Sequence, residues 1–384
     1  MQARHRLSLI LLSLTIGLAN AAWAHPEYRV TVVAPANSAA TDINKDGVVV
    51  GNYPFSATST HAFLNRGKGL VDLGTLRGTA SDAVAINDKG QVLGHWTTAA
   101  GQKRGFIYYR GERRDIGVIP GRSTTYTDIN DAGFITAYGY LPNPNTDEGP
   151  HSFLRAPDGT FRDIGSLPFA NPITYASALN HRNQITGASG PLTHPDQPFR
   201  AFIWTKGVMR DLGDLGTEPN GGLAINDRGQ ITGYASLPDG LHAEVAFLYS
   251  NGRLVDIDGR PATAFPFSAG TGINIYGHVV GKSDHLSGFI YRGKRMESLN
   301  ALIDPRAGWD IRYPQAINDA GQIAATAFRN GVQYAVRLEL IRPHAMQAPA
   351  LELDDEAAGE AADEADAKAD VQAQTYETVQ PVKQ

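Results

Sequence analysis

The histidine, aspartate and aromatic residues are the side chains of this chain that could do chemistry, so their spacing is the first evidence on function. His181, His194, His242, His278 and His285 are dispersed, and none shows the spacing of a metal-ligand motif. The His-Glu-x-x-His, Gly-x-Ser-x-Gly and phosphate-loop patterns are absent from the sequence. We therefore predict no catalytic residue, no metal site and no cofactor.

One segment, Asp42 to Gly47, matches the first half of a calcium-binding loop. The twelfth position of such a loop holds a bidentate glutamate, and here that position is Tyr53. A tight turn explains the same residues, because Asn or Asp hydrogen-bonds to the backbone ahead of it and Gly accepts a positive φ. We favour the turn over a calcium site.

A recurring Asp-Leu/Ile-Gly triplet carries the most regular carboxylates of the chain. The aspartates of its four clearest copies are Asp72, Asp115, Asp163 and Asp211. A catalytic carboxylate would be expected once, beside a partner that raises its pKa. His61 also stands at a repeated position, two residues before a recurring phenylalanine. We interpret both the aspartates and His61 as structural.

The turn is the unit that organises the chain, because it recurs seven times. Each copy places an asparagine after Ile or Leu and, in six copies, three residues before a glycine. Asn183 replaces that glycine in the fourth copy, and Asn also tolerates the left-handed conformation. The asparagines lie 43 to 50 residues apart, a period typical of a propeller blade, and are Asn44, Asn87, Asn130, Asn180, Asn226, Asn274 and Asn318.

Each copy contains four short runs with the pattern of β-strands, which in the second copy are 82–86, 91–96, 104–109 and 112–117. The seventh copy has no fourth run, whereas a spare run at 28–33 precedes the first asparagine. That run would complete the last sheet beside 334–340 and leave no open edge. We therefore predict an all-β fold, a seven-bladed β-propeller of four-stranded antiparallel blades whose ring is closed by the N-terminal strand in the last blade.

Variable connections on such a scaffold are the expected place for a ligand. The loops between second and third strands, and those between blades, vary in length and emerge on one face, whereas the asparagine turns are constant. Aromatic residues with scattered His and Asp suit a glycan or peptide ligand, although aromatic packing of the channel mouth is an open alternative. The candidate ligand-binding residues on this face are Trp96, Tyr126, Tyr138, Tyr175, His194, Tyr234, His242, Asp284, His285 and Trp309.

The two ends of the chain differ from its repeated body. Residues 1–24 have the basic start, short apolar core and Ala-x-Ala end of a secretory signal peptide, so we expect export to the periplasm or beyond the cell. The body, 25–342, has no cysteine and must be stabilised by burial. The tail, 343–384, is rich in Ala, Asp and Glu, which predicts disorder. Because the acidity lies in the tail, the body offers no basic footprint for nucleic acid.

Three motifs occur together in the body, best seen at Ala85–Gly94, His61–Leu64 and Asp72–Leu76. In this combination the chain resembles the HAF-type extracellular repeat of bacterial exported proteins over essentially the whole body. The resemblance weakens in the last two copies, at Asn274–Gly277 and Val336. It implies an exported repeat protein of unassigned activity and supplies no catalytic residues.

The function predicted from these observations is that of an exported, non-catalytic binding or scaffold propeller for an unidentified ligand such as a glycan or a protein. We expect a monomer with no nucleic-acid partner and no membrane insertion after signal cleavage. The alternative is a polysaccharide hydrolase or lyase with acids, or a His/Tyr/Arg group, converging on the variable-loop face. An outer-membrane barrel is disfavoured, because its strands would need about 9–11 residues.

Overall fold

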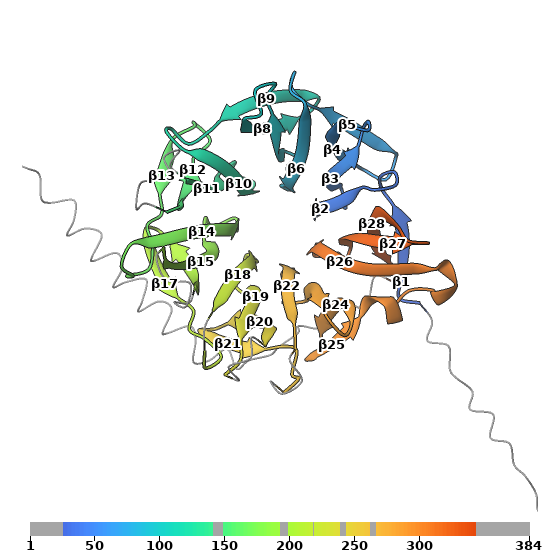
Figure 1. Ribbon diagram of the computed structural model, residues 1–384. Helices are drawn as coiled ribbons and strands as arrows, with labels where there is room; N and C mark the ends of the chain where they lie inside the picture. The colour runs from blue at the N-terminus through green and yellow to red at the C-terminus, as the bar shows by residue number, and fades with distance from the viewer. Residues whose placement is uncertain are drawn as a thin grey trace, which may run out of the picture.

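Seven four-stranded antiparallel sheets stand in a ring around a central axis in the computed structural model of the chain (Figure 1). The structure describes residues 26–140, 149–192, 199–217, 219–238, 243–261 and 266–342. The predicted signal peptide and acidic tail lie outside these residues. The ring confirms the predicted seven-bladed propeller, and within the described residues its regular structure is almost entirely strand.

The blades follow one another along the chain, and each runs from an inner to an outer strand. Blade 1 comprises β2 (Ala39–Ile43), β3 (Val49–Pro54), β4 (Thr60–Asn65) and β5 (Leu70–Gly74). Blade 2 comprises β6 (Ala80–Ile86), β7 (Val92–Thr97), β8 (Lys103–Tyr109) and β9 (Glu112–Gly117). Blade 3 comprises β10 (Ser123–Ile129), β11 (Ile135–Tyr140), β12 (His151–Arg155) and β13 (Phe161–Asp163). Blade 4 comprises β14 (Pro172–Leu179), β15 (Ile185–Pro191), β16 (Arg200–Thr205) and β17 (Val208–Asp211).

The remaining three blades keep the same order until the last strand. Blade 5 comprises β18 (Asn220–Ile225), β19 (Ile231–Ser236), β20 (Glu244–Ser250) and β21 (Arg253–Asp256). Blade 6 comprises β22 (Ser268–Ile273), β23 (Val279–Ser283), β24 (Ser287–Arg292) and β25 (Arg295–Ser298). Blade 7 comprises β26 (Trp309–Ile317), β27 (Ile323–Arg329), β28 (Val332–Leu340) and β1 (Tyr28–Val32). Two short 3₁₀ helices, η2 (Leu299–Ala301) and η3 (Pro305–Ala307), precede blade 7.

The N-terminal strand closes the ring, as the sequence predicts. β1 pairs with β28 in antiparallel register, with Tyr28 opposite Leu340 and Val32 opposite Val336. The predicted strands of the second repeat also match blade 2 to within two residues at each end. β1 therefore supplies the outer strand of blade 7, and the N-terminal strand covers the edge that β28 would otherwise expose.

The core lies between neighbouring blades, and the recurring phenylalanines fill it. Phe63, Phe106, Phe202, Phe247 and Phe289 are all fully buried. The small residue seven places after each asparagine makes room for them. A Cβ added to Gly94 would come within 2.5 Å of both the Asp82 carbonyl oxygen and the Phe106 ring. Close backbone approach therefore requires glycine there.

The repeated aspartates have structural partners in every clear copy. The Asp72 carboxylate accepts from the Gly74 amide at 2.8 Å and from His61 Nδ1 at 2.9 Å. In the following three blades, the equivalent aspartate bonds to Arg104, His151 or Arg200 on the third strand. Each carboxylate thus fixes a turn and joins the two outer strands, as expected from its repetition.

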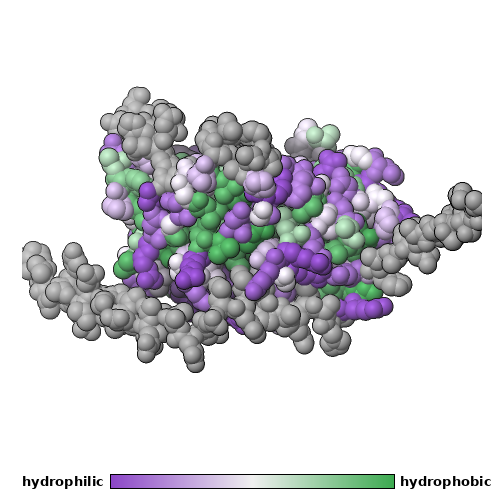
Figure 2. Space-filling view, turned by 90° about the horizontal axis from the view of Figure 1, so that it is seen from below, coloured by the Kyte–Doolittle hydropathy of each residue, from purple (hydrophilic) through white to green (hydrophobic). Residues whose placement is uncertain are grey.

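Figure 2 shows the ring from its edge, with hydrophilic and hydrophobic residues intermixed along the outer wall. In the part of the chain that the structure describes, no helix has the length and apolar character needed to cross a bilayer.

Candidate functional site

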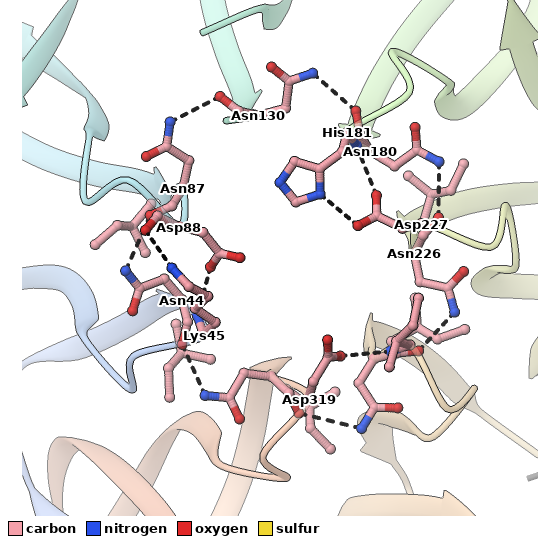
Figure 3. Close-up of a pocket in the computed structure, with 18 of the residues that line it drawn as sticks. Asn44, Lys45, Asn87, Asp88, Asn130, Asn180, His181, Asn226, Asp227 and Asp319 are labelled. Carbon is pink, nitrogen blue, oxygen red and sulfur yellow. Dashed lines mark hydrogen bonds and ion pairs between the residues drawn. The ribbon is translucent and has the colours of Figure 1, made fainter. Parts of the chain in front are cut away.

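The seven repeated asparagines form a closed hydrogen-bonded ring around the axis (Figure 3). Each side-chain amide nitrogen donates to the backbone carbonyl of the asparagine in the next blade, over distances of 2.8 to 3.4 Å. The asparagines, the Ile or Leu before them and residues after them line a pocket of about 190 Å³. One end of the axial channel is therefore framed by polar groups supplied by all seven blades.

The same asparagines also form the turns that the sequence predicts. Asn44 Oδ1 accepts from the amides of Asp46 at 3.2 Å and Val48 at 3.0 Å. The oxygen atom thus stabilises the turn, and the nitrogen atom bonds to the neighbouring blade. This double role explains why asparagine occupies every copy, since aspartate would supply only the acceptor.

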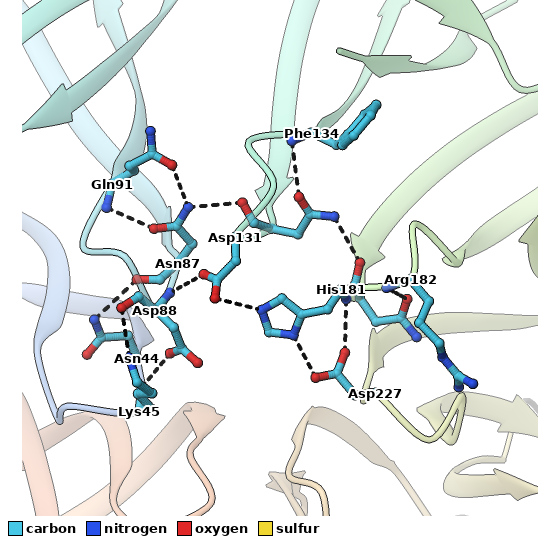
Figure 4. Close-up of polar contacts among 12 residues, drawn as sticks. Asn44, Lys45, Asn87, Asp88, Gln91, Asp131, Phe134, His181, Arg182 and Asp227 are labelled. Carbon is cyan, nitrogen blue, oxygen red and sulfur yellow. Dashed lines mark hydrogen bonds and ion pairs between the residues drawn. The ribbon is translucent and has the colours of Figure 1, made fainter. Parts of the chain in front are cut away.

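In six blades the residue after the asparagine lines this opening, which we call the axial mouth. These residues are Lys45, Asp88, His181, Asp227, Ile275 and Asp319. The equivalent residue of blade 3, Asp131, lines the neighbouring pocket between blades 2 and 3 and contacts His181 at the edge of the mouth. Where the residue after the asparagine is an aspartate, its carboxylate accepts a hydrogen bond from the backbone amide of the equivalent residue one blade earlier. The Lys45 amide donates to Asp88 in this way, and the Asp88 amide donates to Asp131, both at 2.8 Å (Figure 4). Three carboxylates line the axial mouth against one lysine, and Asp131 lies at its edge, so the mouth is acidic.

His181 lies between two of these carboxylates. Its Nδ1 is 2.6 Å from Asp227 Oδ2, and its Nε2 is 3.2 Å from Asp131 Oδ2. Partial burial alone would lower the pKa of His181, but the hydrogen bond to Asp227 and the charges of Asp227 and Asp131 raise it above its ordinary value. The imidazole is thus held in one orientation at the axial mouth, with Nε2 facing the Asp131 carboxylate.

Asp88, Asp131 and His181 are the residues that could hold a metal ion. One donor atom from each lies within 4.8 Å of the others. Two carboxylates and one imidazole suit a divalent transition metal such as Zn²⁺, with ligands at about 2.0–2.2 Å. The Nδ1 contact of His181 with Asp227 provides the carboxylate partner that metal-ligating histidines ordinarily have. Blades 2, 3 and 4 would therefore supply the ligands, and Asp227 of blade 5 orients the histidine.

Two of the residues predicted from sequence meet on the opposite, variable-loop face. Tyr138 and Tyr175 have ring centroids 5.2 Å apart in an edge-on arrangement. Tyr140 joins them through a hydroxyl contact of 3.1 Å with Tyr175, and Phe199 packs on Tyr175 at 5.8 Å. Tyr140 is 44% exposed, so this aromatic cluster offers a stacking surface to solvent.

Asp284 and His285 also lie together, in a network of charges. Arg260 donates to Asp258 and to Asp284, at 2.6 Å in each case. Burial acts in the other direction, but the hydrogen bonds from Arg260 hold the pKa of both carboxyls below the ordinary range. His285 Nδ1 bonds instead to the Ser283 hydroxyl at 2.7 Å. Both carboxylates thus stay ionised at neutral pH.

The other sequence-predicted residues are separated around the ring. Tyr126 is 1% exposed and lies in the core with Ile116 and Ile129, and Trp96 packs against the core between blades 1 and 2. Tyr234 is half-buried beside Gly221, and Trp309 packs edge-on against Tyr334 in blade 7. His194 and His242 lie outside the described residues.

Sequence reasoning passed over the residues of the axial mouth. His181 has no ligand partner at short sequence spacing, because Asp131 and Asp88 lie one and two repeats away. The available signal is the column of residues after each asparagine. Four of its seven members are aspartates, and in a ring a column of this kind converges on one opening.

The ring of sheets and its axial channel place this chain in the class of seven-bladed β-propellers. No family model and no curated protein matches its sequence.

Among solved structures, it is similar to an acylaminoacyl peptidase from Pyrococcus horikoshii, with 9% identity, a TM-score of 0.51 and coverage of 76% of this chain and 49% of that one. The chain thus spans about half the length of that peptidase. It is also similar to a puromycin-hydrolysing peptidase from Mycobacterium tuberculosis (11% identity, TM-score 0.47, 78% and 53% coverage). A third is TolB from Acinetobacter baumannii (7% identity, TM-score 0.43, 76% and 64% coverage). At such identities the likeness to the first of these shows the propeller fold alone.

Proposed function

We propose that this chain is an exported, non-catalytic binding propeller that holds a divalent metal ion at its axial mouth, where the ion anchors a glycan or protein ligand. The observation that carries the proposal is the convergence of Asp88, Asp131 and His181 from three blades, with Asp227 behind the histidine. The signal-like residues 1–24 and the resemblance of the repeats to the HAF type support export.

The fixed geometry of the ligands supports a resident ion. Asp88 and Asp131 each use one carboxylate oxygen to accept a backbone amide at 2.8 Å. The other oxygen of Asp131 lies 3.2 Å from His181 Nε2, a contact that a bound ion would replace. Three protein ligands leave a four-coordinate zinc ion with one open position, which an oxygen atom of a sugar or of a protein surface can fill.

The catalytic alternative on the variable-loop face has weaker support. A glycoside hydrolase needs one carboxyl with a raised pKa as proton donor. The pair described there, Asp258 and Asp284, is bridged by Arg260, and the pKa of each carboxyl is lowered. Burial raises the pKa of the neighbouring Asp256, but its carboxylate oxygen Oδ1 accepts from the amides of Asp258 and Gly259 in a turn. We therefore retain binding as the proposed function, with polysaccharide cleavage as an outcome to be measured.

The test is a calorimetric titration of ZnCl₂ into chelator-treated mature protein. We expect one site per chain in the wild type. His181→Ile, which places at this position the residue type of Ile275 in blade 6, should weaken binding at least about tenfold, and Asp227→Asn should weaken it about 10–100-fold by freeing the histidine. The matched control is His151→Ala, which removes a histidine paired with Asp163 at 2.9 Å on an outer strand.

Zinc affinity that is the same in His181→Ile, His151→Ala and the wild type would exclude this site. The binding role is tested by a glycan array run with and without zinc, with product analysis of the same polysaccharides. Metal-dependent retention without new reducing or unsaturated ends supports a binding protein. Metal-dependent cleavage of a polysaccharide would instead show that the chain is an enzyme.

A further inference from the structure

One position of the repeat departs from its pattern in a single blade. This position lies on the third strand, two residues after the recurring Phe or Val. In every blade it pairs with the first apolar residue of the second strand. In six blades it is neutral, and in four of these it is aromatic. These six residues are Asn65, Tyr108, Trp204, Tyr249, Tyr291 and Leu338. In blade 3 it is Arg155, opposite Ile135.

Arg155 is buried although it is charged. The residue is only 7% exposed. Its Nη1 donates to the Ala156 carbonyl at 3.2 Å, and its guanidinium lies 5.8 Å from the Phe161 ring. Its Nε is buried and has no hydrogen-bond partner among the described residues. Burial lowers the pKa of Arg155, and the nearby Arg114 lowers it further.

Arg155 lines a pocket of about 270 Å³ between blades 2 and 3. Lys89 and Arg114 line it as well, together with Gln91, Ile107, Tyr109, Asp131 and the 132–133 turn. No carboxylate in the described part of the chain lies within 4 Å of Lys89, Arg114 or Arg155. The acidic groups nearby are Asp131, whose carboxylate already bonds to the Asp88 amide, and Asp158, which favours the charged form of Arg155 from a distance.

A buried cation without a paired anion is costly, and a protein keeps one where a ligand supplies the counter-charge. We propose that the pocket between blades 2 and 3 binds a tetrahedral oxyanion, a phosphate or sulfate that is free or carried as a monoester. Three cationic side chains from two blades converge there, so several oxygens of one anion can be bonded at once. A carboxylate, with two oxygens, could engage only part of this set.

The experiment is a calorimetric titration of the mature protein with sodium phosphate, sulfate and acetate at constant ionic strength, with the wild type and three variants. Arg155→Tyr restores the residue type of blades 2, 5 and 6 and should abolish binding. Arg114→Gln, a change of an exposed side chain, should weaken binding at least about fivefold. Arg113→Gln is the control, because Arg113 lies on the same strand outside the pocket and its Nη2 is 3.5 Å from the Asp72 carbonyl.

Binding of phosphate or sulfate that is stronger than that of acetate, lost in Arg155→Tyr and kept in Arg113→Gln, supports the site. Titrations with glucose 6-phosphate and glucose 6-sulfate then distinguish a free anion from an ester. If Arg155→Tyr fails to fold, the comparison of anion binding by Arg114→Gln and Arg113→Gln tests the site. Wild-type protein that binds neither anion, or equal binding in Arg114→Gln and Arg113→Gln, overturns the proposal. Zinc binding by the Arg155→Tyr variant should remain as in the wild type, so the two proposed sites can fail separately.

Discussion

The side-chain amide of Asn318 donates to the backbone carbonyl of Asn44 at 2.9 Å, and so joins the last blade to the first across 274 residues of sequence. The other six asparagines make the equivalent bond to the following blade. The propeller is therefore closed twice, by β1 at its outer edge and by this ring at its axis. The ring also positions Asp88, Asp131 and His181, the proposed metal ligands, which directly follow its members.

Replacing a ring asparagine with aspartate separates the turn role from the ring role. Asn226→Asp keeps the acceptor for the amides of Arg228 and Gln230 but removes the donor to the Asn274 carbonyl. We expect the free energy of unfolding to fall by about 1–3 kcal/mol at pH 7, because buried acceptors then face a carboxylate in place of an N–H donor. Differential scanning calorimetry measures the change. Asn251→Asp, at a positive-φ turn of the same blade, is the control and should have little effect. Equal melting of the two variants would mean that only the turn matters.

Ring closure by β1 predicts a large effect from one residue of that strand. Tyr28 is 1% exposed and packs with Leu299 and Ile303, so Tyr28→Ala should destabilise the propeller by about 3–5 kcal/mol. Val32 lies on the same strand and is 45% exposed, so Val32→Ala should cost no more than about 0.5 kcal/mol. Thermal melts of both variants give the comparison. Similar small effects would show that β1 adds little to closure.

Asp42 predicts a pH dependence of stability. Burial, followed by the nearby charge of Asp128, raises the pKa of Asp42 to about 7, against amide hydrogen bonds from Ile86 and Ile43. The folded state therefore keeps a proton that the unfolded chain loses near its ordinary pKa of 3.8, and stability falls as pH rises from about 4 to 7.

In four other blades the position of Asp42 holds alanine, at Ala85, Ala178, Ala224 and Ala316. Between pH 4.5 and 7.5 the free energy of unfolding should fall by about 1–2 kcal/mol less in Asp42→Ala than in the wild type, as measured by urea unfolding across this range. Asp46→Ala, which removes an exposed carboxylate from the adjoining turn, is the control. An unchanged slope in Asp42→Ala would assign the pH dependence to other groups.

The aromatic cluster on the variable-loop face predicts a contribution to glycan binding. Tyr140 is its most exposed member, and stacking of a sugar ring on it would be lost in Tyr140→Ala. We expect about a tenfold loss of affinity for any glycan found on the array, measured by calorimetry. Tyr313→Ala removes a tyrosine of similar exposure, 43%, from a distant blade and serves as the control. Equal affinity in both variants would mean that Tyr140 takes no part in glycan binding.

Local rules in the sequence were sufficient to predict the fold. The Asn-x-x-Gly spacing and four strand runs per copy are visible along the chain, and the missing fourth strand after Leu340 led directly to the pairing with Tyr28. The phenylalanine positions follow from the same repeat. Blade count and ring closure are therefore predictable from periodicity alone.

The axial mouth was not predictable in the same way. Nδ2 of Asn44 bonds to Asn87 and His181 bonds to Asp227, so these contacts run between repeats at distances set by ring geometry. The candidate residues chosen from loop variability included Tyr126, whose burial depends on packing against blade 2. The departure of Arg155 from its column became meaningful only when strand register showed that the seven positions are equivalent.

The most direct measurement is X-ray diffraction at the zinc absorption edge from crystals of the mature protein grown with zinc. The account predicts an anomalous peak about 2.0–2.2 Å from His181 Nε2 and from carboxylate oxygens of Asp88 and Asp131, with Nδ1 still bonded to Asp227. Crystals soaked with zinc that show no peak at the axial mouth, with His181 still bridging Asp131 and Asp227, would contradict it.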